Sequence, residues 1–113
     1  MSTERILILV KPDGVRRNLV GEVLRRIEAK GYTLENIAWK NATEELLSQH
    51  YNELVDKPFY PDIVSYMTSG PIVAAVFNGA QIVKGVRNLA GATDPTSAAP
   101  GTIRGDLARD WGD

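Results

Sequence analysis

Two arginines border a run of small residues that could bind phosphate. Arg87 and Arg104 flank an irregular stretch, Gly91 to Ile103, that has few side chains able to drive burial. A long stretch without regular structure inside a small domain is often functional. Guanidinium groups bind phosphate oxygens in pairs, and glycine lets backbone N–H groups approach an anion closely. We therefore expect a phosphate-binding loop within residues 91–113.

Other residues could complete such a site, although each has a simpler interpretation. Lys11 follows an apolar run, at the strand end where α/β sheets often place ligands, but it could be a solvated turn lysine. Arg87 could interact with the dipole at the end of a helix. Thr93, before Asp-Pro, could start a turn, and Phe59 could be a core residue or a platform on which a base stacks.

Histidine and cysteine contents limit the chemistry further. His50 is the only histidine, on a predicted helix where a structural role is the simpler interpretation, and there is no cysteine. These residues cannot form a protein-ligated zinc site, and neither the G-x-G-x-x-G nor the P-loop motif occurs. If a metal participates, we expect Mg²⁺ held by nucleotide phosphates rather than by protein side chains.

Composition indicates a single domain over residues 1–113 with ordinary hydrophobic and charged contents. The net charge of −1 argues against a broad nucleic-acid surface, so we expect no specific nucleic-acid partner. The longest apolar runs are too short to span a bilayer, and the first residues do not resemble a signal peptide. We expect a cytoplasmic protein that does not bind membranes.

Hydrophobic periodicity predicts three strands and four helices. Ile6–Val10 is expected to lie in mid-sheet, and a turn at Lys11–Gly14 should follow it. The other expected strands are Tyr32–Lys40, half-exposed, and Pro71–Phe77, central. The expected helices are Asn18–Lys30, Asn41–Val55 with Asn41 as N-cap, Tyr60–Met67, and Gln81–Ala90 with Val83, Val86 and Leu89 facing inward.

This order of elements fits an α+β fold of the ferredoxin-like type, βαββαβ, in which helices pack on an antiparallel sheet. That plan needs a fourth strand after the long loop, paired with the first strand. We expect this final strand, and the helix that would follow it, to be missing from the 113 residues.

Taken together, the motifs closely resemble those of nucleoside diphosphate kinases. The resemblance covers Ile6 to about Asp106, and each motif is weak alone but specific in this order and spacing. The matching segments are Lys11–Val15, His50-Tyr51, Lys57–Phe59, Ser69–Pro71, Arg87 with Gly91 and Thr93, and Pro100–Asp106. The family fold is ferredoxin-like, in agreement with the order of elements.

For the phosphate side of a nucleotide, the resemblance implies several binding residues. Lys11 would bond the ribose hydroxyls and approach the transferred phosphate. Arg87, Thr93 and Arg104 would hold oxygens of the β- and γ-phosphates, and Tyr51 would lie close to the phosphoryl acceptor. Phosphoryl transfer depends mainly on such alignment and charge neutralisation.

For the base, the resemblance implies stacking between two side chains. Phe59 would stack on one face with Ile63 packing nearby, and Trp111 would occupy the position of an aliphatic residue on the other face. Because stacking tolerates every base, we expect ATP, ADP, GTP and other nucleoside di- and triphosphates to be accepted.

The implied reaction is transfer of the γ-phosphate of a nucleoside triphosphate to a nucleoside diphosphate. It is a ping-pong reaction through a phosphohistidine. The family's nucleophilic histidine lies beyond Asp113, and His50 matches a different histidine, so we expect no catalytic residue and no activity in these 113 residues. Relatives are homo-oligomers, so a tetramer or hexamer is expected.

Two other interpretations remain open at this point. One is a non-catalytic nucleotide-binding or scaffolding module of the same fold. The other is a ferredoxin-like regulatory domain that binds a different small anion, which would leave Phe59, Thr93 and the two arginines without a role.

Overall fold

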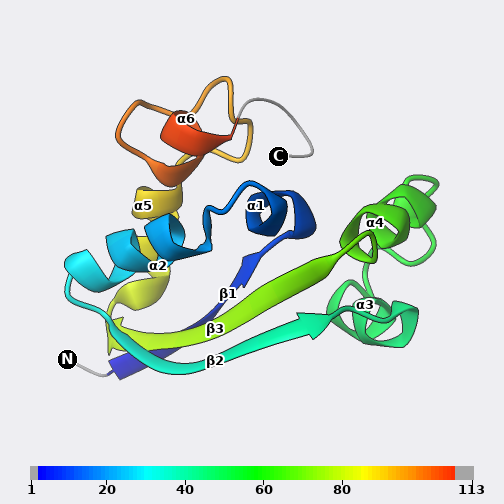
Figure 1. Cartoon of the computed structure of the whole chain (residues 1–113), viewed down its shortest axis with the longest axis horizontal. Coiled ribbons are helices and arrows are strands. Elements are labelled where there is room, and N and C mark those ends of the chain that lie inside the picture. Colours follow the sequence, from blue (N-terminus) through cyan, green and yellow to red (C-terminus); the bar gives the residue numbers. More distant parts are fainter. Residues whose placement is uncertain (1–2, 109–113) are drawn as a thin grey trace.

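The computed structural model describes residues 3–108, which fold around one antiparallel sheet. Its strands are β1 (Thr3–Val10), β2 (Thr33–Asn41) and β3 (Pro71–Ala80), in the spatial order β1-β3-β2 (Figure 1). This arrangement confirms the α+β, ferredoxin-like prediction. Within the described range, no helix combines the length and apolar character that crossing a bilayer requires.

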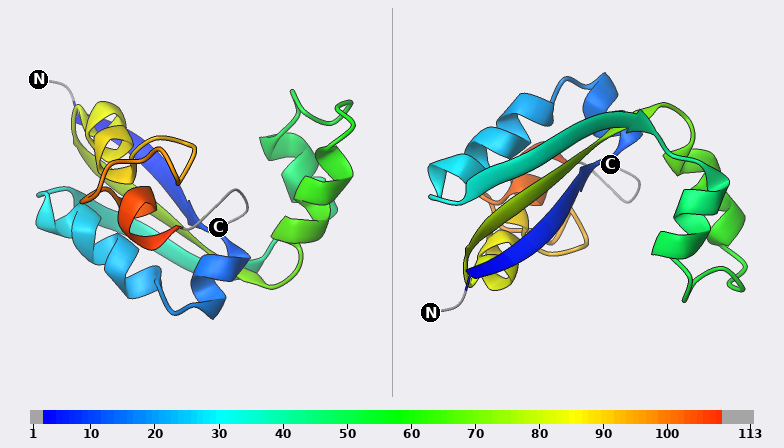
Figure 2. Two further views of the ribbon diagram at one scale, coloured as in Figure 1. Left: turned by 90° about the horizontal axis from the view of Figure 1, so that it is seen from above. Right: turned by 90° about the horizontal axis from the view of Figure 1, so that it is seen from below.

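Helices cover one face of the sheet and extend it at one end. Figures 1 and 2 show α1, α2 and α5 on the same side of the sheet, with α3 and α4 grouped where β2 ends and β3 begins. The helices are α1 (Pro12–Arg16), α2 (Val20–Ala29), α3 (Glu44–His50), α4 (Tyr60–Met67), α5 (Ile82–Ala90) and α6 (Ile103–Leu107).

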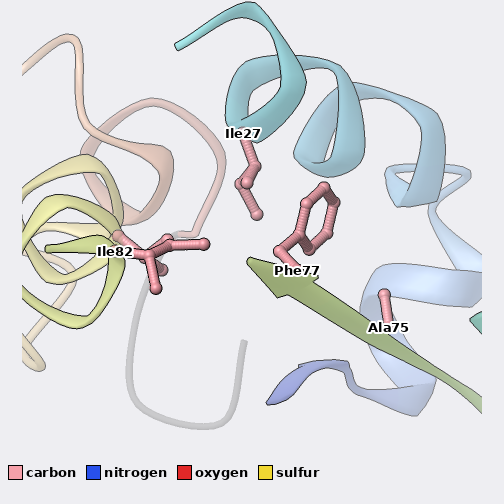
Figure 3. Packing of buried hydrophobic residues seen from close by; sticks show 5 residues of the cluster. Ile27, Ala75, Phe77 and Ile82 are labelled. Atoms are coloured by element: carbon pink, nitrogen blue, oxygen red, sulfur yellow. The ribbon is translucent and has the colours of Figure 1, made fainter. Parts of the chain in front are cut away.

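The main core lies between β3 and the two helices that cross it. Ile27 of α2 and Ile82 of α5 point toward Phe77 of β3, and all three side chains are fully buried (Figure 3). Each buried side chain of this size stabilises the fold by about 1.5–3 kcal/mol. This packing fixes α5, and therefore Arg87, relative to the sheet.

β1 differs from its prediction. It lies at an edge of the three-stranded sheet, as expected without a fourth strand to pair with it, but it is not buried on both faces as the apolar run predicted. Ile6 and Ile8 pack against the core, but Leu7 points to the other face and is 49% exposed. The helices cover only one face, so alternate residues of an all-apolar strand remain open. β3 is central, as predicted.

The turn predicted at Lys11–Gly14 is also wrong, because α1 begins at Pro12. Proline lacks the N–H group that a first helical residue leaves unpaired, and its fixed φ suits that position. The next helix starts at Val20 rather than Asn18, because Asn18 has a positive φ of 60°.

Asn41 is the last residue of β2 and not the predicted helix cap. Thr43 caps α3 instead, since its hydroxyl oxygen accepts a hydrogen bond from the N–H of Leu46 at 3.1 Å. The helix ends at His50, well before the predicted Val55. The prediction for Tyr60–Met67 is confirmed at both ends.

In α5 the inward-facing residues shift from the predicted set. Ile82 is fully buried and Val86 nearly so, but Val83 is 37% exposed. The helix begins at Ile82, after Gln81 in a left-handed conformation, so the first core position is Ile82. The apolar pattern alone did not reveal this start.

Candidate functional site

A cavity of about 390 Å³ lies beside β1, where helices α1, α5 and α6 come together. Its floor is apolar and includes Ile8 and Val10 of β1, Val86 of α5 and Ile103 of α6. Its cationic lining residues are Lys11, Arg17, Arg87 and Arg104. The cavity therefore combines a hydrophobic wall with several positive charges.

Three of these cations were predicted from the sequence, and each comes from a different element. Lys11 is the N-cap residue of α1 and directly follows β1. Arg87 is in the last turn of α5, and Arg104 is in α6. The structure brings these distant residues to the lining of one cavity. Such a convergence of cations can neutralise and orient a di- or triphosphate.

Two of the cations remain available for a ligand. Within residues 3–108, no ion pair involves Lys11 or Arg87, and both residues are exposed. Arg104 is half-buried and donates from Nη1 to the carbonyl oxygen of Gly91 at 2.9 Å. This bond uses one of its N–H groups and leaves the others for an anion.

Residues 91–102 contain no helix or strand, as the sequence predicted, whereas Arg104 lies in the short helix α6 that follows them. Thr102 caps α6, because its hydroxyl oxygen accepts a hydrogen bond from the N–H of Gly105 at 3.0 Å. Gly91 ends α5 with a φ of 85°, and a Cβ there would lie 2.5 Å from Oγ1 of Thr102. Gly91 therefore lets the end of α5 approach the N-cap of α6 closely. Gly105 serves the turn before α6 instead, because a Cβ there would collide with the carbonyl oxygen of Ala99.

Two residues of the cavity were missed by the sequence analysis. Arg17 donates from Nη2 to the carbonyl oxygen of Leu107 at 2.8 Å and so connects α1 to α6. Asp13 places Oδ1 out of solvent without a hydrogen-bond partner in the described part of the chain. The only sequence signal for either was closeness to Lys11.

Other predicted residues do not line this cavity. Tyr51 and Ile63 pack against a second core cluster, formed by Ala42 after β2, Leu47 of α3, Met67 of α4 and Ile72 of β3. Burial raises the pKa of Tyr51, so its hydroxyl stays protonated at neutral pH. Phe59, just before α4, is 48% exposed, and Thr93 is exposed in the loop after α5.

The arrangement places these residues beside the cavity region rather than in it. Figures 1 and 2 show the α3–α4 pair apart from α6, and Phe59 is the residue before α4, whereas Arg104 is in α6. The contacts of Phe59 and Ile63 with a base, and of Tyr51 and Thr93 with the phosphates, stay predictions. Trp111 lies outside the described residues.

The described residues contain no cluster of three or more histidine, aspartate or glutamate side chains that could hold a metal ion. His50 is the last residue of α3, an element that does not contribute to the cavity. The four cationic side chains that line the cavity are groups that can bind and orient a phosphate chain.

The sequence is similar to known proteins over almost its whole length. The family model described as nucleoside diphosphate kinase matches residues 4–113. The nucleoside diphosphate kinase of Eremothecium gossypii is 54% identical over 112 residues, which cover 99% of this chain and 74% of that protein. Nucleoside diphosphate kinase 3 of Mus musculus is 54% identical over 109 residues, covering 96% and 64% of the two chains.

Solved structures give the same result for the fold. A halophilic nucleoside diphosphate kinase from Halobacterium salinarum, solved in complex with CDP, superposes with a TM-score of 0.94 at 48% identity. The match covers 98% of this chain and 73% of that chain. A nucleoside diphosphate kinase family protein from Babesia bovis has a TM-score of 0.91 at 43% identity, covering 95% and 72%.

Proposed function

Because the chain belongs to the nucleoside diphosphate kinase family, we propose that it binds nucleoside di- and triphosphates through their phosphate tails. The observation that carries this proposal is the convergence of Lys11, Arg87 and Arg104 on one cavity. A phosphate chain carries several negative charges, and cations from three separate elements can meet different oxygens along it. The reaction that such binding serves is transfer of a γ-phosphate between nucleotides.

The three cations would have distinct tasks. Arg87 is exposed and makes no ion pair within the described residues, so its whole guanidinium could pair with phosphate oxygens. Arg104, held through Gly91, would present a fixed fork of N–H groups. Lys11 would supply a mobile point charge, to the ribose or to the terminal phosphate.

The base would be held separately, outside the cavity. The exposed ring of Phe59 offers a face for stacking. Ile63, which packs against the second core cluster, is the other residue predicted on that side of the base. Trp111 would lie on the other face of the base, whereas Thr93 and Tyr51 would contact the phosphate side of the nucleotide. These contacts, and the acceptance of all bases, stay predictions from the family resemblance.

Mg²⁺ bound to the nucleotide would neutralise part of the phosphate charge. Asp13 supplies the only carboxylate that lines the cavity in the described part of the chain, so the phosphates themselves would provide most ligands. The magnesium requirement, a homo-oligomeric assembly and a cytoplasmic location also stay predictions.

We further propose that these 113 residues bind nucleotide without accepting the phosphoryl group. Their only histidine, His50, ends α3, which does not line the cavity. Incubation with γ-labelled ATP should therefore leave no acid-labile label on the chain. Phosphohistidine at His50 would contradict this proposal.

Calorimetric titration with ADP tests the cavity assignment. Replacing Arg87 with alanine should weaken binding by about 1.5–3 kcal/mol, roughly 10- to 150-fold, because a charge-assisted contact is lost. Lys84→Ala is the matched control, since Lys84 lies one turn earlier on the same helix and does not line the cavity.

Arg104→Ala should weaken ADP binding by a similar amount. Because Arg104 also bonds Gly91, the Arg87 variant is the cleaner of the two. Unchanged ADP affinity in both arginine variants would contradict the proposed function, as would an equal loss in Lys84→Ala.

A further inference from the structure

A charged network holds α6 against α2. Arg26 of α2 forms an ion pair from Nη1 to Oδ2 of Asp106 at 2.9 Å, and the same nitrogen lies 3.4 Å from the carbonyl oxygen of Thr102. Its Nε bonds Oε2 of Glu22, one turn earlier on α2, at 2.8 Å. One half-buried guanidinium therefore reaches both ends of α6 from a single point on α2.

Asp106 also bonds the loop that precedes α6. Its Oδ1 accepts a hydrogen bond from the backbone N–H of Gly101 at 2.8 Å, while Oδ2 faces Arg26. The N–H of Gly101 and then the guanidinium of Arg26 lower the pKa of Asp106, so the carboxylate is charged at neutral pH. The two oxygens thus connect the turn before α6 to the body of the protein.

Arg104 depends on this anchoring. α6 has only five residues, and a helix of that length has no independent stability in water. Its position must therefore come from tertiary contacts. Arg26 contacts Thr102, the cap of α6, and Asp106 within α6, and these two residues lie on either side of Arg104 in the chain.

We propose that Arg26 is a positioning residue for phosphate recognition, acting through Asp106 to hold Arg104 at the cavity. This inference rests on the proposed function of Arg104. Arg26 itself does not line the cavity, so it would not touch the nucleotide. Its effect on binding would pass entirely through α6.

The adjacent arginine provides a matched control. Arg25 also pairs with Glu22, at 2.9 Å, but its side chain is 64% exposed and makes no hydrogen bond or ion pair with the loop within the described residues. Both arginines therefore satisfy the helix-pair spacing with Glu22, yet only Arg26 contacts α6. Arg25→Ala therefore reports on the stability of α2 alone, whereas Arg26→Ala also removes the contact with α6.

The test measures the dissociation constant for ADP by calorimetry. Arg26→Ala should weaken ADP binding about three- to tenfold, which is less than the effect of removing Arg104 itself. The reason is that a partly exposed ion pair contributes only modestly to holding α6 in place. Arg25→Ala should change it by less than about twofold. Arg26→Lys, which keeps the charge, should recover part of the affinity.

The double variant distinguishes positioning from a general loss of structure. In an Arg104→Ala background, adding Arg26→Ala should cost little more, because both changes act on the same contact. Asp106→Asn keeps an acceptor for Gly101 but removes the charge, and should match Arg26→Ala in its effect on ADP.

Equal effects of Arg25→Ala and Arg26→Ala would overturn the inference, and so would a full additional loss in the double variant. In either case a normal loss in Arg104→Ala would leave the proposed function standing. If Arg104→Ala alone bound ADP like the unmodified chain, the assignment of Arg104 to the phosphate site would be wrong instead.

Discussion

Replacing Gly91 with alanine should destabilise the chain by about 2–5 kcal/mol. Gly91 has φ 85° and ψ −176°, a region that only glycine adopts readily, and forcing another residue there costs about 1–3 kcal/mol. The new Cβ would also lie 2.5 Å from Oγ1 of Thr102, and overpacking of this kind costs about 1–3 kcal/mol. A more restricted unfolded chain offsets about 0.4–1 kcal/mol.

Urea unfolding followed by circular dichroism measures this loss directly. Gly21→Ala is the matched control, because a Cβ at Gly21, within α2, meets nothing within 4 Å and alanine favours a helix. Its stability should therefore stay the same or rise by up to about 1 kcal/mol. A Gly91→Ala variant as stable as the unmodified chain would refute the close approach of α5 and α6. So would an equal loss in both variants.

Glu22→Gln tests the ion pairs of α2: Arg25 and then Arg26 lower the pKa of Glu22 from 4.5 to about 2. The Glu22 ion pairs stabilise the fold fully above pH 4.5, and this contribution is lost as pH falls toward 2. The difference in unfolding midpoint between Glu22→Gln and the unmodified chain should therefore shrink over that range. A pH-independent difference would contradict the pairing. Gly85→Ala should destabilise by about 1–3 kcal/mol, because its Cβ would collide with the hydroxyl of Tyr32. Tyr32→Phe should relieve part of that loss, and no relief would refute this contact.

Local signals in the sequence identified most helices and strands, but they did not show which strands pair with each other in the sheet. Ile6–Val10 and Pro71–Phe77 are both apolar runs, and nothing within either run says which strand has partners on both sides. The structure assigns the central position to β3 and the edge to β1. Edge and centre depend on pairings between distant segments, which local patterns do not contain.

The residues in and around the cavity likewise divide into those with a local sequence signal and those that depend on contacts with distant segments. Lys11, Arg87 and Arg104 could be found from the sequence because Lys11 follows an apolar strand and the two arginines border a run of small residues. Arg17 and Arg26 could not, since their partners, the carbonyl oxygen of Leu107 and the carboxylate of Asp106, lie far away in the chain. Their role depends on where α6 packs, and short helices of that kind are fixed by tertiary contacts.

A crystal structure of the chain with Mg²⁺ and ADP would test the central claim most directly. We predict that the diphosphate lies in the cavity beside β1, with Arg87 and Arg104 bonded to its oxygens and Lys11 within reach of the ribose or the phosphate. A nucleotide bound with its phosphates away from these three side chains would contradict the account.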